Sequence, residues 1–431
     1  MAQGRILLDL RPLRESAPFR RVFIARTISI FGIGMLMVGV PIQMYSLTES
    51  SFLVGLVASV EGGAAIGGML IGGSLADRYD RRTLILFART VSGITFVGLA
   101  INAMLDSPSV VAIFVLAVVN GLIGSISVAA LFAVIPALIS KDQLVGAGAL
   151  NVLSARAGSV VSPALGGVVI AAASVAWNYW IAAAGTAITV ALLSGLPSMR
   201  PPEHDAESSG TDGSPEHGNS VLRFLARSPV VGGVIAAGMV AMIGGGVLVL
   251  VPGLVDERYG GDSRAAGLLY AAAAVGAVAA TVTSGWLTRA RRPGLVLLVA
   301  LPAGFAVQAL VGWAAGIAVA FAILAVAGAV SSVQEVLRYS IIQTHTPSRM
   351  LGRVNGLWSA QEVAGLSVGA FVAGVFGTVF SASDAIVYYS LSAVVLALVL
   401  FVVLGSLRRV AGGARISEFS STGPAAEPAD A

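Results

Sequence analysis

The chain has 431 residues, of which 56% are hydrophobic and 11% are charged, and its mean hydropathy is +0.89. Because ordinary soluble domains carry roughly a quarter charged residues, this composition excludes a water-soluble fold and indicates a membrane protein. The absence of cysteine excludes disulfides and thiolate metal sites, and the net charge of +4 indicates no nucleic-acid partner.

The N-terminal segment, residues 1–20, carries six charged side chains and no cleavable apolar core. We therefore expect no signal peptide and an N-terminus that stays in the cytoplasm.

Apolar runs long enough to cross a membrane follow one another from residue 21 to residue 406. The first six predicted spans are 21–44, 53–75, 84–105, 109–134, 145–171 and 176–196. The second six are 229–252, 264–288, 294–314, 316–340, 352–379 and 384–406. The sequence thus predicts an all-α integral membrane protein with one six-helix bundle at residues 21–196 and another at residues 229–407.

Two polar segments flank the second bundle. Most of residues 197–228 and 408–431 is rich in Pro, Ser, Gly and acidic side chains, and such segments bury too little apolar surface to order themselves. We expect a cytoplasmic linker between the bundles and a disordered cytoplasmic tail.

The distribution of cations predicts the orientation, because Lys and Arg in short loops hold the cytoplasmic side. They fall at the termini and in alternate loops, apart from Arg258 and Arg264, which share their loop with three acidic residues. Both ends of the chain are therefore expected in the cytoplasm of a bacterial inner-membrane protein.

A weak internal repeat relates the two bundles. Gly55 and Gly73 bracket the second span as Gly267 and Gly285 bracket the eighth, at the same offset, and each closing glycine precedes a basic turn. Two halves built on one plan are typical of transporters that bind their substrate between repeats.

A glycine–acid–arginine motif follows the second span, and its key residues are Gly73, Asp77, Arg78, Arg81 and Arg82. The glycine permits close helix approach, the carboxylate can cap a helix or pair with arginine, and the arginines anchor the turn. A plain positively charged loop is the simpler interpretation. The motif resembles the signature of the major facilitator superfamily, in which it latches the two halves on the cytoplasmic side, although Asp80 stands where that family commonly has glycine.

The fifth span contains a second motif, formed by Gly158, Pro163, Gly166 and Gly167. Proline removes a helical hydrogen bond and small residues permit tight packing. The motif is similar to the kinking motif of antiporters in the same superfamily.

Longer stretches resemble the enterobactin-type siderophore exporters of that superfamily, namely residues 19–30, 73–89, 175–179 and 346–358. The resemblance implies proton-driven export of a catecholate or related siderophore and places the second and eleventh spans side by side. Related members export macrolides and other drugs, so multidrug efflux by proton antiport is the alternative.

Ionisable residues inside the membrane are the candidates for the proton and substrate pathway, because an unpaired charge there costs about 2.5–3.5 kcal/mol. They are Glu61, Glu362, Arg156, Arg26, Glu335 and Arg338, and Trp358 and Asn355 share a polar helix face with Glu362. Structural ion pairing is the simpler interpretation, above all for Glu335 and Arg338, which are i,i+3 neighbours. We expect Glu61 and Glu362 each to bind and release a proton during transport. A carboxyl group in a low-dielectric environment keeps a proton more readily than one in water.

No catalytic, metal or cofactor site is expected. The only lysine, Lys141, is not part of a phosphate-binding loop, and His204, His217 and His345 form no ligand cluster. An integral-membrane enzyme or receptor is therefore disfavoured, and the expected partners are a small-molecule substrate, protons and lipid, with the protein acting as a monomer.

Overall fold

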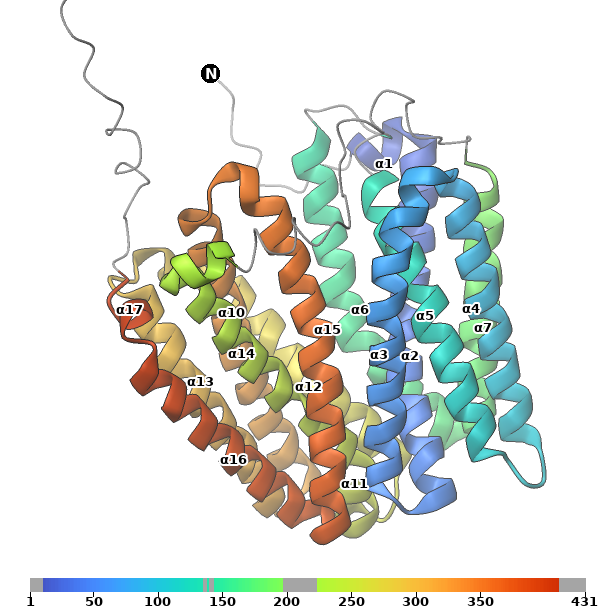
Figure 1. Cartoon of the computed structure of the whole chain (residues 1–431). Helices are drawn as coiled ribbons and strands as arrows, with labels where there is room; N and C mark the ends of the chain where they lie inside the picture. The colour runs from blue at the N-terminus through green and yellow to red at the C-terminus, as the bar shows by residue number, and fades with distance from the viewer. Residues whose placement is uncertain (1–10, 135–137, 139–142, 197–222, 411–431) are drawn as a thin grey trace, which may run out of the picture.

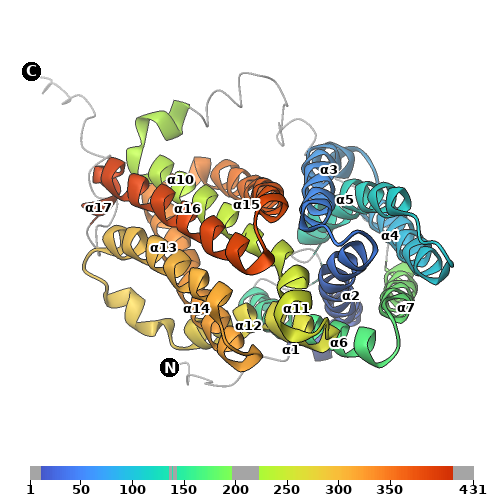
Figure 2. The ribbon, with the colours of Figure 1, turned by 90° about the horizontal axis from the view of Figure 1, so that it is seen from below.

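The computed structural model describes residues 11–134, 138, 143–196 and 223–410, and all of its regular elements are helical. Much of the predicted linker and tail, and the first ten residues, lie outside this described part. The helices form two groups that stand side by side (Figures 1 and 2).

The N-terminal half contains six long helices after one short helix. Its elements are α1 (Arg11–Glu15), α2 (Ala17–Thr48), α3 (Ser51–Arg78), α4 (Arg81–Met104), α5 (Val110–Val134), α6 (Leu144–Ala172) and α7 (Val175–Ser194). Polar side chains start several of them, because the first backbone N–H groups of a helix need acceptors. Ser16 accepts from the backbone of Phe19 in α2, and Asp80 accepts from that of Thr83 in α4, each at 3.2 Å.

The C-terminal half has more interrupted helices, joined by short 3₁₀ segments. Its elements are α10 (Pro229–Gly244), η3 (Gly245–Leu250), α11 (Val251–Tyr259), α12 (Ser263–Val282), η4 (Ser284–Arg289), α13 (Pro293–Ala309), η5 (Leu310–Trp313), α14 (Ile317–His345), α15 (Ser348–Val379), α16 (Ala382–Val403) and α17 (Gly405–Arg408).

Within the described residues, twelve helices are long and apolar enough to cross a membrane, which confirms the predicted number. Several predicted ends were wrong. The seventh span continues through η3 to Tyr259, the eighth ends at Val282, and the tenth continues to His345, which is the last residue of α14 rather than part of a loop. The tenth was predicted too short because the mostly polar segment from Tyr339 to His345 continues the helix beyond its apolar run.

The two halves use the same helix pairing. In the N-terminal half α3 packs on α5, α4 on α7, and α2 on α6; in the C-terminal half α12 packs on α14, α13 on α16, and α10 on α15. The halves meet through two further pairs, α3 with α15 and α6 with α12. The structure therefore has the duplicated plan that the repeat predicts, with the second and eleventh spans adjacent.

Glycines set these contacts between the halves. A Cβ on Gly167 of α6 would lie 2.6 Å from the Cα of Gly267 in α12, and one on Gly55 of α3 would lie 2.3 Å from the carbonyl oxygen of Ala370 in α15. No larger residue fits without moving a helix, so the backbones touch here.

We call the face that carries α1 and the start of α15 the terminal face, at the top of Figure 1. The glycine contacts lie toward the opposite face. Nearer the terminal face, no described atom outside the local helix comes within 4 Å of a Cβ placed on Gly73, Gly148 or Gly352.

The hydrophobic cores have the same asymmetry. One large cluster combines residues of both halves, among them Val57 and Leu99 with Leu254 and Leu269. The smaller clusters around Ile85 and around Phe19 belong to the N-terminal half alone, and the cluster around Leu297 belongs to the C-terminal half alone. The halves are thus joined toward the opposite face and separate toward the terminal face.

Candidate functional site

A cavity of about 490 Å³ lies between the two halves. Its walls come from α2, α3, α4 and α5 on one side and from η3, α12 and α15 on the other, and they are mostly apolar. The polar lining residues are Glu61, Asn120, Tyr270 and Ser367. A cavity of this size is large enough for a drug-sized molecule.

Glu61 is the ionisable acid among the described residues that line this cavity. The Nδ2 of Asn120, on α5, donates a hydrogen bond of 2.9 Å to its Oε1. Close helix packing brings the two side chains together, because a Cβ on the neighbouring Gly121 would lie 2.2 Å from the carbonyl oxygen of Glu61. The amide therefore holds the carboxyl group at the cavity wall.

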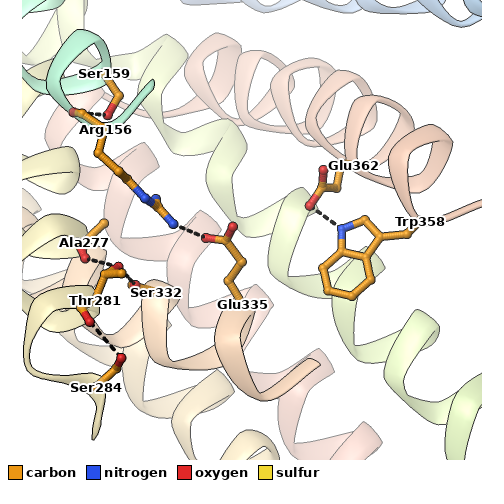
Figure 3. Close-up of polar contacts among 9 residues, drawn as sticks. All are labelled: Arg156, Ser159, Ala277, Thr281, Ser284, Ser332, Glu335, Trp358 and Glu362. Atoms are coloured by element: carbon orange, nitrogen blue, oxygen red, sulfur yellow. Dashed lines mark hydrogen bonds and ion pairs between the residues drawn. The ribbon is translucent and has the colours of Figure 1, made fainter. Parts of the chain in front are cut away.

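A second polar cluster lies among α6, α14 and α15 (Figure 3). Arg156 on α6 forms an ion pair with Glu335 on α14, in which Nη2 and Oε2 are 3.5 Å apart. Among the described contacts of this cluster, it is the one that links the two halves. Both side chains are partly exposed, at 31% and 47%. Among the described contacts Glu335 pairs with Arg156 rather than with Arg338, because Glu335 points toward α6 whereas Arg338 points into the C-terminal half.

Arg338 is 2% exposed and lies among α10, α14 and α15. Its guanidinium carbon is 5.0 Å from the centre of the Trp358 ring, a cation–π arrangement. A Cβ on Gly238 would lie 2.3 Å from its Nη1, so that glycine makes room for it. Among the described residues, neither its Nε nor the Nε2 of neighbouring Gln361 has a hydrogen-bond partner.

Glu362 accepts a hydrogen bond from the indole Nε1 of Trp358, one helical turn away (Figure 3). It is not part of the cavity wall, although Val363, Leu366 and Ser367 of the same helix are. Ser367 contacts Gly62, the neighbour of Glu61, so Glu362 lies about 7.5 Å along α15 toward the terminal face from the level of Glu61. The two carboxyl groups therefore occupy adjoining sites rather than one.

The remaining candidates are placed less centrally. Arg26 is half-buried in α2, and Asn355 is exposed near the start of α15. Gly365 and Gly369, on the helix face that carries Asn355, pack against α10 at Met242 and Ile243. That part of the face serves helix packing and not a pathway.

The arginines of the first motif hold a helix end. Arg82 donates to the carbonyl oxygen of Ser194, and Arg21 donates to that of Gly195 at 2.7 Å, so two cations neutralise the C-terminal end of α7. This contact lies within the N-terminal half. Arg78 is exposed, Arg81 is half-buried, and the side chain of Asp77 lies outside the described part.

The second motif serves two interfaces. Pro163 lies inside α6, where Gly158 faces Ile30 of α2 and Gly166 faces Met35 of the same helix. Gly167 faces α12. The small residues thus allow α6 to pack closely in its own half and against the other half.

Sequence reasoning missed Asn120, Gln361 and Gly238. Each lies in an apolar span, where an amide side chain needs a partner and a glycine needs a packing reason. Their residue types were visible, but their partners lie on other helices: Glu61 is 59 residues from Asn120, and Arg338 is 100 residues from Gly238 and 23 from Gln361.

The Major Facilitator Superfamily model matches residues 22–331, well over half of this chain. The chain belongs to the major facilitator superfamily and is a multi-pass inner-membrane transport protein. It is 40% identical over 411 residues to the enterobactin exporter EntS of Citrobacter koseri, which covers 94% of this chain and 95% of the relative. To the enterobactin exporter EntS of Salmonella typhi it is 40% identical over 407 residues, with 94% and 96% covered. The predicted resemblance to enterobactin-type exporters is confirmed.

Solved transporters share the fold. The nucleoside transporter NupG matches with a TM-score of 0.71 at 12% identity, over 90% of this chain and 99% of that one. The peptide transporter POT in complex with sulfate matches with a TM-score of 0.68 at 14% identity, over 95% and 97%. Identities this low show the shared fold alone.

Proposed function

We propose that this chain exports an enterobactin-like catecholate siderophore across the cytoplasmic membrane in exchange for protons. The observation that carries the proposal is the 40% identity to enterobactin exporters along 94% of the chain. The cavity supports it, because its apolar walls and few polar groups suit a large aromatic ligand.

The terminal face is the cytoplasmic face in this proposal. Arginine-rich turns such as residues 78–82 and 289–292 support that orientation, since cations are retained on the cytoplasmic side. The halves separate toward this face and are joined toward the other, so the conformation is the one that loads substrate from the cytoplasm.

Proton coupling is assigned to Glu61 and Glu362. Glu61 faces the substrate cavity, and Glu362 adjoins the only described ion pair between the halves through Trp358 and Arg338. A proton arriving at Glu362 would remove one of the two negative charges that attract Arg338, the other being Glu335. Arg338 would then compete with Arg156 for Glu335, which loosens the bridge between the halves.

The energy suffices without ATP. One proton that crosses about 150 mV releases roughly 3.5 kcal/mol, enough to concentrate a neutral substrate a few hundredfold. No catalytic role is part of the proposal, and a monomer suffices for it.

The test compares cells lacking the gene with cells that carry it or its Glu362→Gln variant. Iron-starved deletion cells should retain metal-free siderophore, the wild-type gene should restore secretion, and Glu362→Gln should not, at equal protein level. In vesicles the variant should lose up to a few hundredfold of concentrating power while still equilibrating substrate. Glu49→Gln, a matched substitution far from both sites, should behave as wild type. Normal secretion from the deletion strain contradicts the proposal.

Multidrug or macrolide efflux is the second candidate, favoured by the apolar character of the cavity walls. It predicts that the deletion strain becomes sensitive to these drugs while siderophore secretion is normal. Dose–response growth curves on the same strains separate the two functions.

A further inference from the structure

The charge of the cavity wall is one-sided. Its described lining includes one carboxyl group, that of Glu61, and no Lys, Arg or His. A ligand in the cavity therefore meets no cationic side chain from the described part of the wall.

The two arginines of the polar cluster already interact with other side chains. Arg156 pairs with Glu335, and Arg338 is stacked on Trp358 inside the C-terminal half, 2% exposed. Neither lines the cavity. An anionic ligand would thus be bound at low dielectric without a compensating charge, which is costly.

Glu61 is arranged to accept a hydrogen bond from a ligand. Asn120 occupies its Oε1 at 2.9 Å, and among the described residues no donor reaches its Oε2. Asn120 also restricts the rotation of the carboxyl group, so the second oxygen has a defined position. A hydroxyl group of a ligand can donate to this oxygen.

These features discriminate between the two forms of a catecholate siderophore, if the proposed function holds. Without metal, its phenolic hydroxyls keep their protons at neutral pH, so the molecule is uncharged and rich in donors. When three catechols bind Fe³⁺, each loses both protons, and the complex keeps a net negative charge and no phenolic donor.

We propose that the cavity selects the metal-free, protonated siderophore and rejects its metal complex, with Glu61 as the specificity-determining residue. In its deprotonated state the carboxylate accepts from a phenol of the free ligand and repels the complex, and the described wall offers no cation to pair with the anion. An exporter built in this way releases the chelator without expelling iron that the cell has captured.

Equilibrium binding to the full-length protein in nanodiscs tests the proposal without a proton gradient. The probes are a metal-free tris-catechol siderophore and its Ga³⁺ complex, a redox-inert analogue of the iron complex. We expect the metal-free form to bind roughly a hundredfold more tightly to the wild type. Glu61→Gln keeps the side-chain size and a partner for Asn120, and it should narrow this ratio mainly by improving binding of the complex. The matched substitution Glu49→Gln should leave the ratio unchanged.

The outcomes are distinguishable. Equal or tighter binding of the Ga³⁺ complex by the wild type overturns the selectivity proposal while leaving siderophore export intact. An unchanged ratio in Glu61→Gln overturns the role of that residue. If the wild type binds neither form, the proposed function fails, and the inference fails with it.

Discussion

A buried guanidinium in an apolar helix bundle needs several kinds of support at once. Arg338 lies over the Trp358 ring, has room because residue 238 is glycine, and is attracted by Glu362 and Glu335. Each support comes from a different residue, so the position tolerates change poorly. Arg156 and Glu335 are more exposed than Arg338, so water stabilises each charge and neither needs its partner as much.

The Arg156–Glu335 pair should therefore contribute little energy. Its groups are 31% and 47% exposed, and pairs of this kind contribute about 0.2–1 kcal/mol after screening by solvent. We expect a double-mutant cycle of Arg156→Gln and Glu335→Gln, followed by thermal unfolding in detergent, to give a coupling energy in that range. A coupling energy well above it would show that the pair is stronger than its exposure implies.

At the scale of helices, the α6–α12 and α3–α15 contacts bring the backbones of the two halves together at glycines. Ser51 lies in the second of these contacts, 6% exposed, against Gly374 and Gly377 of α15. A wedge at either contact should separate the halves on the face opposite the terminal face. The natural absence of cysteine makes this separation measurable by labelling.

Gly167→Val should open that face. The added side chain meets the Cα of Gly267 at 2.6 Å, and packed backbones yield only by moving apart. In this variant a Ser51→Cys reporter should react with a maleimide several times faster than in the otherwise wild-type chain. Gly148→Val, on the same helix but with open space at residue 148, is the control and should leave the labelling rate unchanged. Equal rates in all three proteins would refute the wedge.

At the scale of the whole molecule, one core cluster joins the halves and the clusters nearer the terminal face do not. The molecule loads from the cytoplasm only if the terminal face lies on the cytoplasmic side of the membrane. The orientation of the whole molecule is therefore the property to test.

Single cysteines at two exposed serines test the orientation. Ser107→Cys lies in the loop between α4 and α5, and Ser406→Cys lies in α17 at the C-terminal end of the described chain. A membrane-impermeant maleimide should label Ser107→Cys in intact cells and Ser406→Cys only after permeabilisation. The reverse pattern would place both chain ends outside and would make the conformation one that loads from the exterior.

The sequence by itself determined the number of spans, the two-half plan and the candidate charges. Lipid demands long apolar helices, and it makes every interior charge conspicuous, so these properties are local and can be read from the chain. The family motifs added the adjacency of the second and eleventh spans.

Only the tertiary structure decided the partners. Glu335 had an arginine three residues away in the sequence, yet it pairs with Arg156 on the other half, and Glu61 is held by Asn120 from a neighbouring helix. The reason is physical. These helices carry apolar residues on every face, so the hydrophobic periodicity does not show which face meets protein and which meets lipid. Backbone contacts at glycines set the rotation of each helix about its axis.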